Sequence, residues 1–373
     1  MRRNNSCRRR KRTEKKTIPL PYLPHELIIQ ILLRLPVKSL IRFKCVCKSW
    51  FSLISDNHFA NSHFEITAST HTRRILLTNV FPDFEPISID FEPSIHDDIA
   101  SPDLHYLFPD SYFGLQIKGS CRGFILLHAH SNFYLLNPAT EFQTEIPFSP
   151  FGSEEDGDEY EEDEKFYGFG YDHSTDDYLL VLISFNPIHF EFFSLRANTW
   201  KQIEYAHLPF NPIVGRTKPG LHFNDGIHWL AYHHDLRKGV IVVFDLVERK
   251  LFYMDLPYNS YWCCNLWVFG EFLSFSTMNF RNNTVMIWTM KEYKVNSSWT
   301  KTHVVSVDGT PNESFSPLCC TKNGDIIGID QETGLVRYND KGQLLEHRPY
   351  SSEFEAVVYT ESLLSLPGES EQA

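Results

Sequence analysis

A chain of 373 residues, 42% of them hydrophobic, can bury a substantial core, which argues against an intrinsically disordered protein. The net charge of −12 is unevenly spread, because residues 1–17 carry nine Arg or Lys and residues 154–164 carry nine Asp or Glu. Outside these two runs the chain is mildly acidic and has no contiguous basic track, which argues against nucleic-acid binding. Aromatic residues make up 14% and favour strands over helices.

The compartment follows from the cysteines and from the absence of long apolar runs. Eight cysteines occur without a Cys-x-x-Cys pair, so a zinc site is not expected. The sequence likewise predicts no other metal site and no cofactor. No run approaches eighteen apolar residues, and no apolar segment follows the basic N-terminus, so neither a membrane span nor a secretory signal is expected. We therefore expect a reducing compartment, the cytoplasm and/or the nucleus.

Residues 1–19 form a basic segment with too little apolar content to order itself, and we expect a disordered tail. The run Arg8–Arg12 fits a nuclear-import signal and a solvated charged tail about equally well. We also expect residues 153–164 to form a solvated acidic loop between strands, because like charges at that density repel one another. Residues 369–373 are expected to form a second disordered tail.

Residues 20–66 have the pattern of a short module of three helices. Apolar residues recur at helical spacing from Leu27 to Leu35, on nearly all sides of the first helix. Pro24 suits a first helical position, whereas Pro36 ends this helix and can open the next. A module of this size cannot cover an all-round apolar helix by itself, so part of that surface must meet the rest of the chain or a partner.

Residues 67–368 read as strands and turns that recur about every fifty residues, the length of a four-stranded propeller blade of the kelch type. Asn224-Asp225-Gly226 is typical of a tight hairpin turn. Trp200 and Trp299 follow turns of similar sequence and are expected to anchor neighbouring blades. The units begin near Gly119, Phe166, Gly220, Leu266 and Pro317.

The two ends of this region complete the predicted ring. Arg73–Thr78 looks like a strand, and so do Glu355–Tyr359 and Leu363–Leu366 at the other end. Pairing the two ends would remove the exposed edges of a first and a last blade. The sequence therefore predicts a mainly β protein with N-terminal α-helices, in which a short three-helix module precedes a kelch-like β-propeller of about six blades.

Three segments, Leu23–Leu27, Ile31–Leu40 and Arg42–Trp50, together resemble an F-box at nearly every signature position, with Gln30 as one departure from a commonly acidic position. The remainder resembles the F-box-associated, kelch-like region of plant F-box proteins, a group that includes the S-locus F-box proteins. The residues that carry this second resemblance are Gly168–Asp172, Ser174–Tyr178, Leu221–Leu230, Val285–Tyr293 and Tyr359–Leu363. The acidic residues 153–164 depart from that pattern.

The resemblance implies a substrate-recognition subunit of an SCF-type ubiquitin ligase, in which the F-box docks on a Skp1-like adaptor and through it on a cullin. The propeller would then bind an unknown protein target for ubiquitination. Tyr258, Tyr261 and Trp262 are candidates for the target-binding surface, with core packing as an equal alternative. The adaptor-binding residues that the resemblance implies are Leu23, Pro24, Leu27, Ile28, Ile31, Leu32, Leu35, Pro36, Leu40, Val46 and Trp50.

The alternative is a β-propeller enzyme or lectin whose N-terminal helices only pack on the ring. The sequence has no Gly-x-Ser-x-Gly elbow, no phosphate loop and no His-Glu-x-x-His helix, so no catalytic residues are assigned. His233-His234-Asp235 could hold a metal, but consecutive strand residues point to opposite faces, which favours surface or core histidines. We therefore expect a receptor that is not itself an enzyme.

Overall fold

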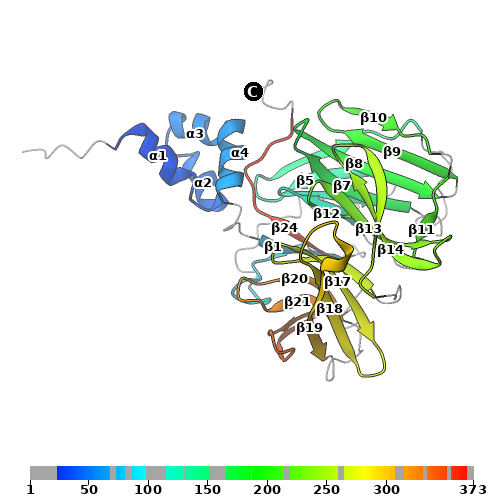
Figure 1. Ribbon diagram of the computed structural model, residues 1–373. Coiled ribbons are helices and arrows are strands. Elements are labelled where there is room, and N and C mark those ends of the chain that lie inside the picture. Colours follow the sequence, from blue (N-terminus) through cyan, green and yellow to red (C-terminus); the bar gives the residue numbers. More distant parts are fainter. Residues whose placement is uncertain are drawn as a thin grey trace, which may run out of the picture.

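The computed structural model describes residues 23–67, 73–79, 86–97, 115–129, 132–151, 165–185, 187–205, 207–213, 219–258, 264–306, 315–330, 334–350 and 354–367. Four α-helices stand beside a ring of six β-sheets (Figure 1). The mainly β class, the N-terminal helices and the six-bladed propeller are thus confirmed. The expected tails 1–19 and 369–373 and the acidic loop 153–164 lie outside the described residues. No helix within the described ranges is long and apolar enough to cross a membrane.

The N-terminal segment contains four helices instead of the three expected. Pro24 and Pro36 directly precede the first two helices as capping residues, each one position earlier than a first helical residue. The additional fourth helix begins after Asp56, whose carboxylate accepts a hydrogen bond from the Phe59 N–H at 2.9 Å. The helices are α1 (His25–Leu32), α2 (Val37–Phe43), α3 (Lys48–Ile54) and α4 (Asn57–Ile66).

Five of the six blades are antiparallel sheets of consecutive strands, and their innermost strands begin close to the positions that the repeat predicts. The first two blades contain β3 (Gln116–Cys121), β4 (Phe124–Ala129), β5 (Asn132–Asn137), β6 (Phe142–Ile146), and β7 (Lys165–Asp172), β8 (Asp177–Phe185), β9 (Ile188–Ser194), β10 (Thr199–Gln202). The third contains β11 (Phe210–Pro212), β12 (Leu221–Phe223), β13 (Gly226–His233), β14 (Lys238–Asp245) and β15 (Lys250–Asp255). The fourth and fifth contain β16 (Cys264–Phe269), β17 (Phe272–Asn279), β18 (Thr284–Met290), β19 (Trp299–Ser306), and β20 (Phe315–Cys320), β21 (Ile326–Asp330), β22 (Gly334–Tyr338), β23 (Leu344–Pro349).

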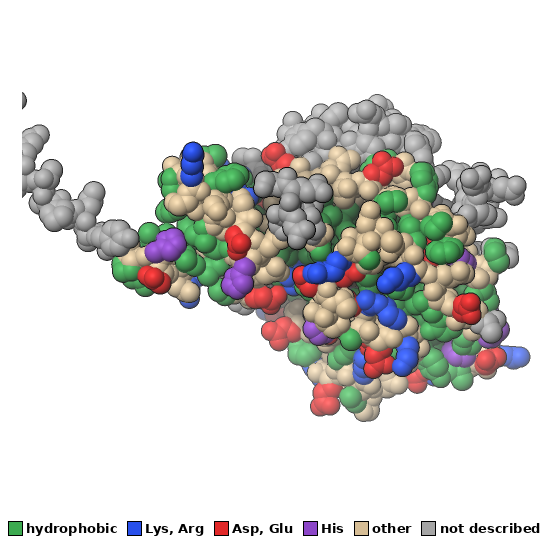
Figure 2. Space-filling model, turned by 90° about the horizontal axis from the view of Figure 1, so that it is seen from above, with side chains coloured by type: hydrophobic (Ala, Val, Ile, Leu, Met, Phe, Trp, Pro, Cys, Tyr) green, Lys and Arg blue, Asp and Glu red, His purple; other side chains and the backbone are tan. Residues whose placement is uncertain are grey.

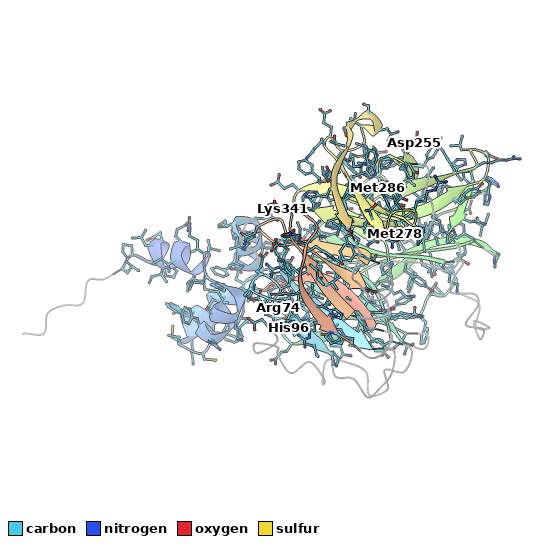
Figure 3. The ribbon with its side chains drawn as sticks, turned by 90° about the horizontal axis from the view of Figure 1, so that it is seen from below. Arg74, His96, Asp255, Met278, Met286 and Lys341 are labelled. Atoms are coloured by element: carbon cyan, nitrogen blue, oxygen red, sulfur yellow. The ribbon has the colours of Figure 1, made fainter. Side chains whose placement is uncertain are left out.

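The sixth blade joins the two ends of the ring, as the sequence predicts. Its strands are β1 (Arg73–Asn79), β2 (Ile87–Ile89) and β24 (Phe354–Thr360), and β24 pairs antiparallel with the whole of β1. Buried Arg74, labelled in Figure 3, braces this sheet by donating from Nε to Ser88 Oγ at 2.6 Å. The expectation of a further strand over Leu363–Leu366 is wrong, because this segment has no ladder partner and packs its leucines beneath the helices.

Local signals explain how the blades are shaped and joined. Asn224 and Asp225 both have positive φ, at 41° and 57°, which makes the tight turn between β12 and β13. Trp200 Nε1 donates to Pro147 O at 2.7 Å, and Trp299 Nε1 donates to Asp255 O at 3.2 Å. Each indole thereby ties its own blade to the end of the preceding one, in the anchoring role that the sequence suggests.

Candidate functional site

The helical module has an apolar surface that the other described parts of the chain do not cover. Leu27 and Ile31 are four residues apart on α1, so their side chains lie on the same face of that helix. In Figure 2 hydrophobic side chains are visible over the helical module among polar ones. We use the name apolar face for the exposed large apolar side chains of α1, α3 and the residues that flank these two helices. They are between 44 and 60% exposed, and they are Leu23, Leu27, Ile31, Val46 and Phe51.

The opposite side of the same helices forms the module's own core. Leu32 and Leu40, which the family resemblance assigns to the adaptor, are at most 1% exposed and therefore support the apolar face without forming part of it. Of the other predicted adaptor-binding residues, Pro24 and Pro36 are exposed, whereas Ile28, Leu35 and Trp50 are half-buried. Phe51 belongs to the apolar face although sequence reasoning missed it; its only signal is its position within the second apolar stretch.

Basic side chains lie on the same helices as the apolar face. Lys38, Arg42 and Lys48 are exposed, whereas Lys44 is half-buried, and burial lowers the pKa of its ammonium group. Among these helices, the only acidic residues that the structure describes are Glu26, Asp56 and Glu65. The exposed surface of α1–α3 therefore combines apolar side chains with an excess of basic ones, which is complementary to an apolar patch with acidic neighbours.

Arg122 fastens the helical module to the ring. It occupies the turn between β3 and β4, and its guanidinium group lies 4.5 Å from the ring of Phe64 on α4 and 4.2 Å from the ring of Tyr171. The same group donates to Asn61 Oδ1 at 2.9 Å and pairs with Glu65 at 3.2 Å. One side chain thus holds α4 against the turns of the first two blades.

The C-terminal segment reinforces this junction. Leu363, Leu364 and Leu366 are buried in one continuous core that also contains helical residues and residues of the first two blades. Asn137 Nδ2 donates to the Leu364 carbonyl at 3.2 Å, and the Ser365 hydroxyl donates to Asn57 on α4. Helix α4 is therefore seated on the ring, and the exposed side chains of α1–α3 remain available to another polypeptide.

The aromatic residues predicted to bind a target lie beyond the last strand of the third blade. Tyr258 follows β15 and is exposed, whereas Tyr261 and Trp262 lie outside the described residues. In an antiparallel blade the turn after the first strand and the link after the fourth strand lie at opposite ends. Because the β3–β4 turn meets the helices, Tyr258 lies at the end of the ring that faces away from them.

Cys121 and His222 form the thiol–imidazole contact of the described part of the ring, with 3.5 Å between Sγ and Nδ1; Cys121 is buried and His222 is half-buried. Burial raises the pKa of the Cys121 thiol to about 12 and lowers the pKa of the His222 imidazole to about 4, so both groups are neutral. A neutral thiol is a weak nucleophile. This pair therefore belongs to the packing between blades.

Metal binding finds no support at the histidines that the sequence singles out. His233 is buried and His234 is exposed, so the two rings point to opposite faces of the strand end. Within the described residues, no group of three or more His, Cys, Asp or Glu side chains is arranged to hold a metal ion. His233 and His234 therefore have the core and surface positions that the strand geometry predicts.

Comparisons with known proteins agree with this architecture. Residues 20–61 match the F-box domain, and residues 82–340 match the F-box associated beta propeller domain. The chain is 28% identical to the F-box/kelch-repeat protein At3g23880 of Arabidopsis thaliana, across 92% of this chain and 95% of that protein. It is 27% identical to the F-box protein CPR1 of the same plant, across 92% of this chain and 88% of that protein. The chain therefore belongs to the family of plant F-box proteins that carry an F-box-associated β-propeller.

Proposed function

We propose that this F-box protein is the substrate-recognition subunit of an SCF-type ubiquitin ligase. The F-box would dock on a Skp1-like adaptor and through it on a cullin, while the propeller would bind the protein to be ubiquitinated. The observation that carries the proposal is the apolar face, which stays exposed although the other side of the same helices is buried in a core that is continuous with the ring. The proposal places this activity in the cytoplasm or the nucleus.

The size of the apolar face determines how much of the binding free energy must come from other contacts with the adaptor. Full burial of a large apolar side chain contributes about 1.5–3 kcal/mol, and these side chains are already half-covered, so the five together contribute roughly 4–7 kcal/mol. Association itself costs about 4–15 kcal/mol in lost rigid-body freedom. The apolar face therefore needs polar contacts as well, and exposed Lys38, Arg42 and Lys48 can supply them to an acidic rim.

The proposal is tested with a matched pair of valines. Val46 lies on the apolar face, whereas Val304 lies on β19, the outer strand of the fourth blade, and both are exposed. In co-purification with a Skp1-like adaptor, Val46→Asp should weaken binding at least about tenfold, because it buries an unpaired carboxylate in the interface. Val304→Asp should bind as the wild type does. Full binding by the Val46→Asp protein would overturn the proposal.

Leu35 is a less suitable position for this test. It packs against the module's own core, and its carbonyl oxygen accepts a hydrogen bond from His63 at 2.8 Å. A Leu35→Asp protein would therefore lose helical packing together with any contact to an adaptor. Val46 has no such role in the core, so its substitution separates docking from folding.

The same variant separates ligase components from targets. Affinity capture would be carried out with wild-type and Val46→Asp protein while cullin and proteasome activity are blocked. Proteins captured by both should include the targets, and proteins lost only with Val46→Asp should be the adaptor and the cullin. Deletion of residues 1–66 would be less informative, because it would expose the buried leucines Leu363 and Leu364.

A further inference from the structure

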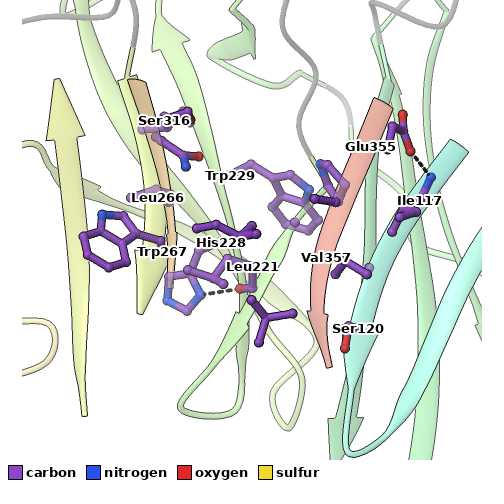
Figure 4. A pocket seen from close by; sticks show the side chains of 18 of the residues that line it. Ile117, Ser120, Leu221, His228, Trp229, Leu266, Trp267, Ser316, Glu355 and Val357 are labelled. Carbon is purple, nitrogen blue, oxygen red and sulfur yellow. Dashed lines mark hydrogen bonds between the residues drawn. The ribbon is translucent and has the colours of Figure 1, made fainter. Parts of the chain in front are cut away.

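The centre of the ring contains a cavity of about 510 Å³. Innermost strands from all six blades contribute to its wall, including β24, β3, β16 and β20 (Figure 4). A volume of this size lies within the range of about 300–1,000 Å³ that holds drug-sized molecules. The strands surround the cavity laterally, so an occupant would have to enter along the axis of the ring.

The wall of this cavity is apolar. Of its 26 lining residues only six are polar, and none of them is Lys or Arg. Some polar atoms of the wall are bonded within it, because Trp229 Nε1 donates to Tyr167 O at 2.8 Å and Asn265 Nδ2 donates to Pro317 O at 2.6 Å. Two others, Trp267 Nε1 and His222 Nε2, are buried without a hydrogen-bond partner. An occupant would therefore meet mainly hydrocarbon and aromatic surface, in which Ser120 contributes a hydroxyl group (Figure 4).

The histidines in the wall carry no positive charge. Burial lowers the pKa of His222 to about 4 and that of His228 to about 3. His228 is also held in one neutral tautomer, because Nδ1 must donate to the Leu221 carbonyl and Nε2 therefore accepts from the Tyr293 hydroxyl at 2.7 Å. The one carboxylate in the wall, Glu355, accepts a hydrogen bond from the Ile117 N–H. Nothing in the lining compensates an anion.

We propose that the central cavity is a binding site for a small, uncharged and predominantly apolar molecule. The volume sets the size class, and the apolar wall supplies the affinity. The lack of Lys, Arg and protonated His excludes anionic ligands, because a buried anion without a partner is strongly disfavoured. This site is separate from the apolar face of the helices, so the two proposals are tested independently of each other.

A matched pair of fluorescent probes tests the predicted selectivity. N-phenyl-1-naphthylamine is neutral, whereas 8-anilino-1-naphthalenesulfonate has a similar ring system and carries a negative charge. Energy transfer from tryptophan to the bound probe gives the binding signal, and Trp229 and Trp267, both in the wall, are the donors that line the cavity. The neutral probe should bind saturably at one site and at least about tenfold more tightly than the anion. Absence of saturable binding, or equal binding of the anion, would overturn the proposal.

Substitutions that fill the cavity test the location. Leu221 and Leu266 both line it, and both are only half-buried, so Leu221→Trp combined with Leu266→Trp adds aromatic volume to open space. The double variant should bind the neutral probe at least about tenfold more weakly. The control is Leu345→Trp on the outer strand of the fifth blade, which should bind as the wild type does. Equal binding by the double variant and the control would contradict the proposal. If the double variant does not fold, the comparison of the two probes in wild-type protein still tests the proposal.

The chain's own N-terminal segment is the competing occupant. Wild-type protein and protein lacking residues 1–22 should bind the neutral probe with the same affinity. Binding that appears only after this truncation would show that the segment fills the cavity, and would overturn the proposal of a small-molecule site.

Discussion

Replacing Arg122 with alanine should loosen the junction between helix α4 and the ring. The Arg122 side chain is only 14% exposed, so the contacts of its guanidinium group are partly shielded from water. The two ring contacts contribute about 0.5–1 kcal/mol each. The bond to Asn61 contributes about 1.5 kcal/mol, and the pair with the exposed Glu65 contributes at most about 1 kcal/mol. Arg122→Ala should therefore cost about 3 kcal/mol in the free energy of unfolding.

The control for this prediction is Arg196→Ala. Arg196 pairs with Asp176 at 2.5 Å, but both side chains are about half-exposed, so its loss should cost less than about 1 kcal/mol. Urea denaturation gives the change in the free energy of unfolding, and hydrogen exchange of the α4 amides shows whether the loss is local to the junction. A double-mutant cycle with Phe64→Ala should yield a coupling of about 0.5–1 kcal/mol. The reasoning is refuted if Arg122→Ala destabilises no more than Arg196→Ala.

Three further predictions concern a glycine, a histidine and a lysine. Gly123→Ala should lower the free energy of unfolding by about 2 kcal/mol more than Gly270→Ala, as measured by thermal unfolding. Both glycines have positive φ, but only at Gly123 would the new methyl group overlap the Ser362 side chain, and equal losses of stability would contradict the prediction. Burial lowers the pKa of His228 to about 3, so the unfolded state binds the extra proton and stability should fall as the pH drops from about 6.5 towards 3. His228→Asn should reduce the slope of stability against pH in this window by up to about 1.4 kcal/mol per pH unit, and an unchanged slope in urea denaturation at several pH values would refute the prediction. In surface-binding kinetics at low salt, Lys48→Glu should lower the association rate constant for the adaptor about fivefold or more and leave the dissociation rate constant nearly unchanged. A change in the dissociation rate constant alone would contradict electrostatic steering.

Much of the fold follows from local signals along the chain. Pro24 and Pro36 mark the first two helix starts, and the Asn224-Asp225 turn marks a hairpin because those residue types tolerate positive φ. Helix α4 has a weaker local signal, the single N-cap residue Asp56. It contains two Asn and two His, which are weak helix formers, and it is stabilised by burying Phe59 against the module's core.

The candidate site was only partly predictable, because tertiary packing and not local sequence decides which side chains stay exposed. An all-round apolar helix does not reveal which side faces the rest of its own chain, so Leu32 could not be separated from Ile31 by periodicity. Leu363–Leu366 has the composition of a strand, but its partner is a helical surface instead of a ladder. Arg122 looks like an ordinary turn residue, because the aromatic rings that it contacts lie about fifty residues away in either direction.

Because β24 and the leucines after it follow the helices and the other five blades in the sequence, the ring can close only after these parts have been synthesised. The helices precede the ring in the sequence, so a ribosome makes them well before β24 and the leucines that pack beneath them. A chain that terminates before β24 would contain the F-box on an open ring, without the leucine contacts at this junction. Such a product would expose the apolar surface that these leucines cover, which makes it a candidate for cellular quality control.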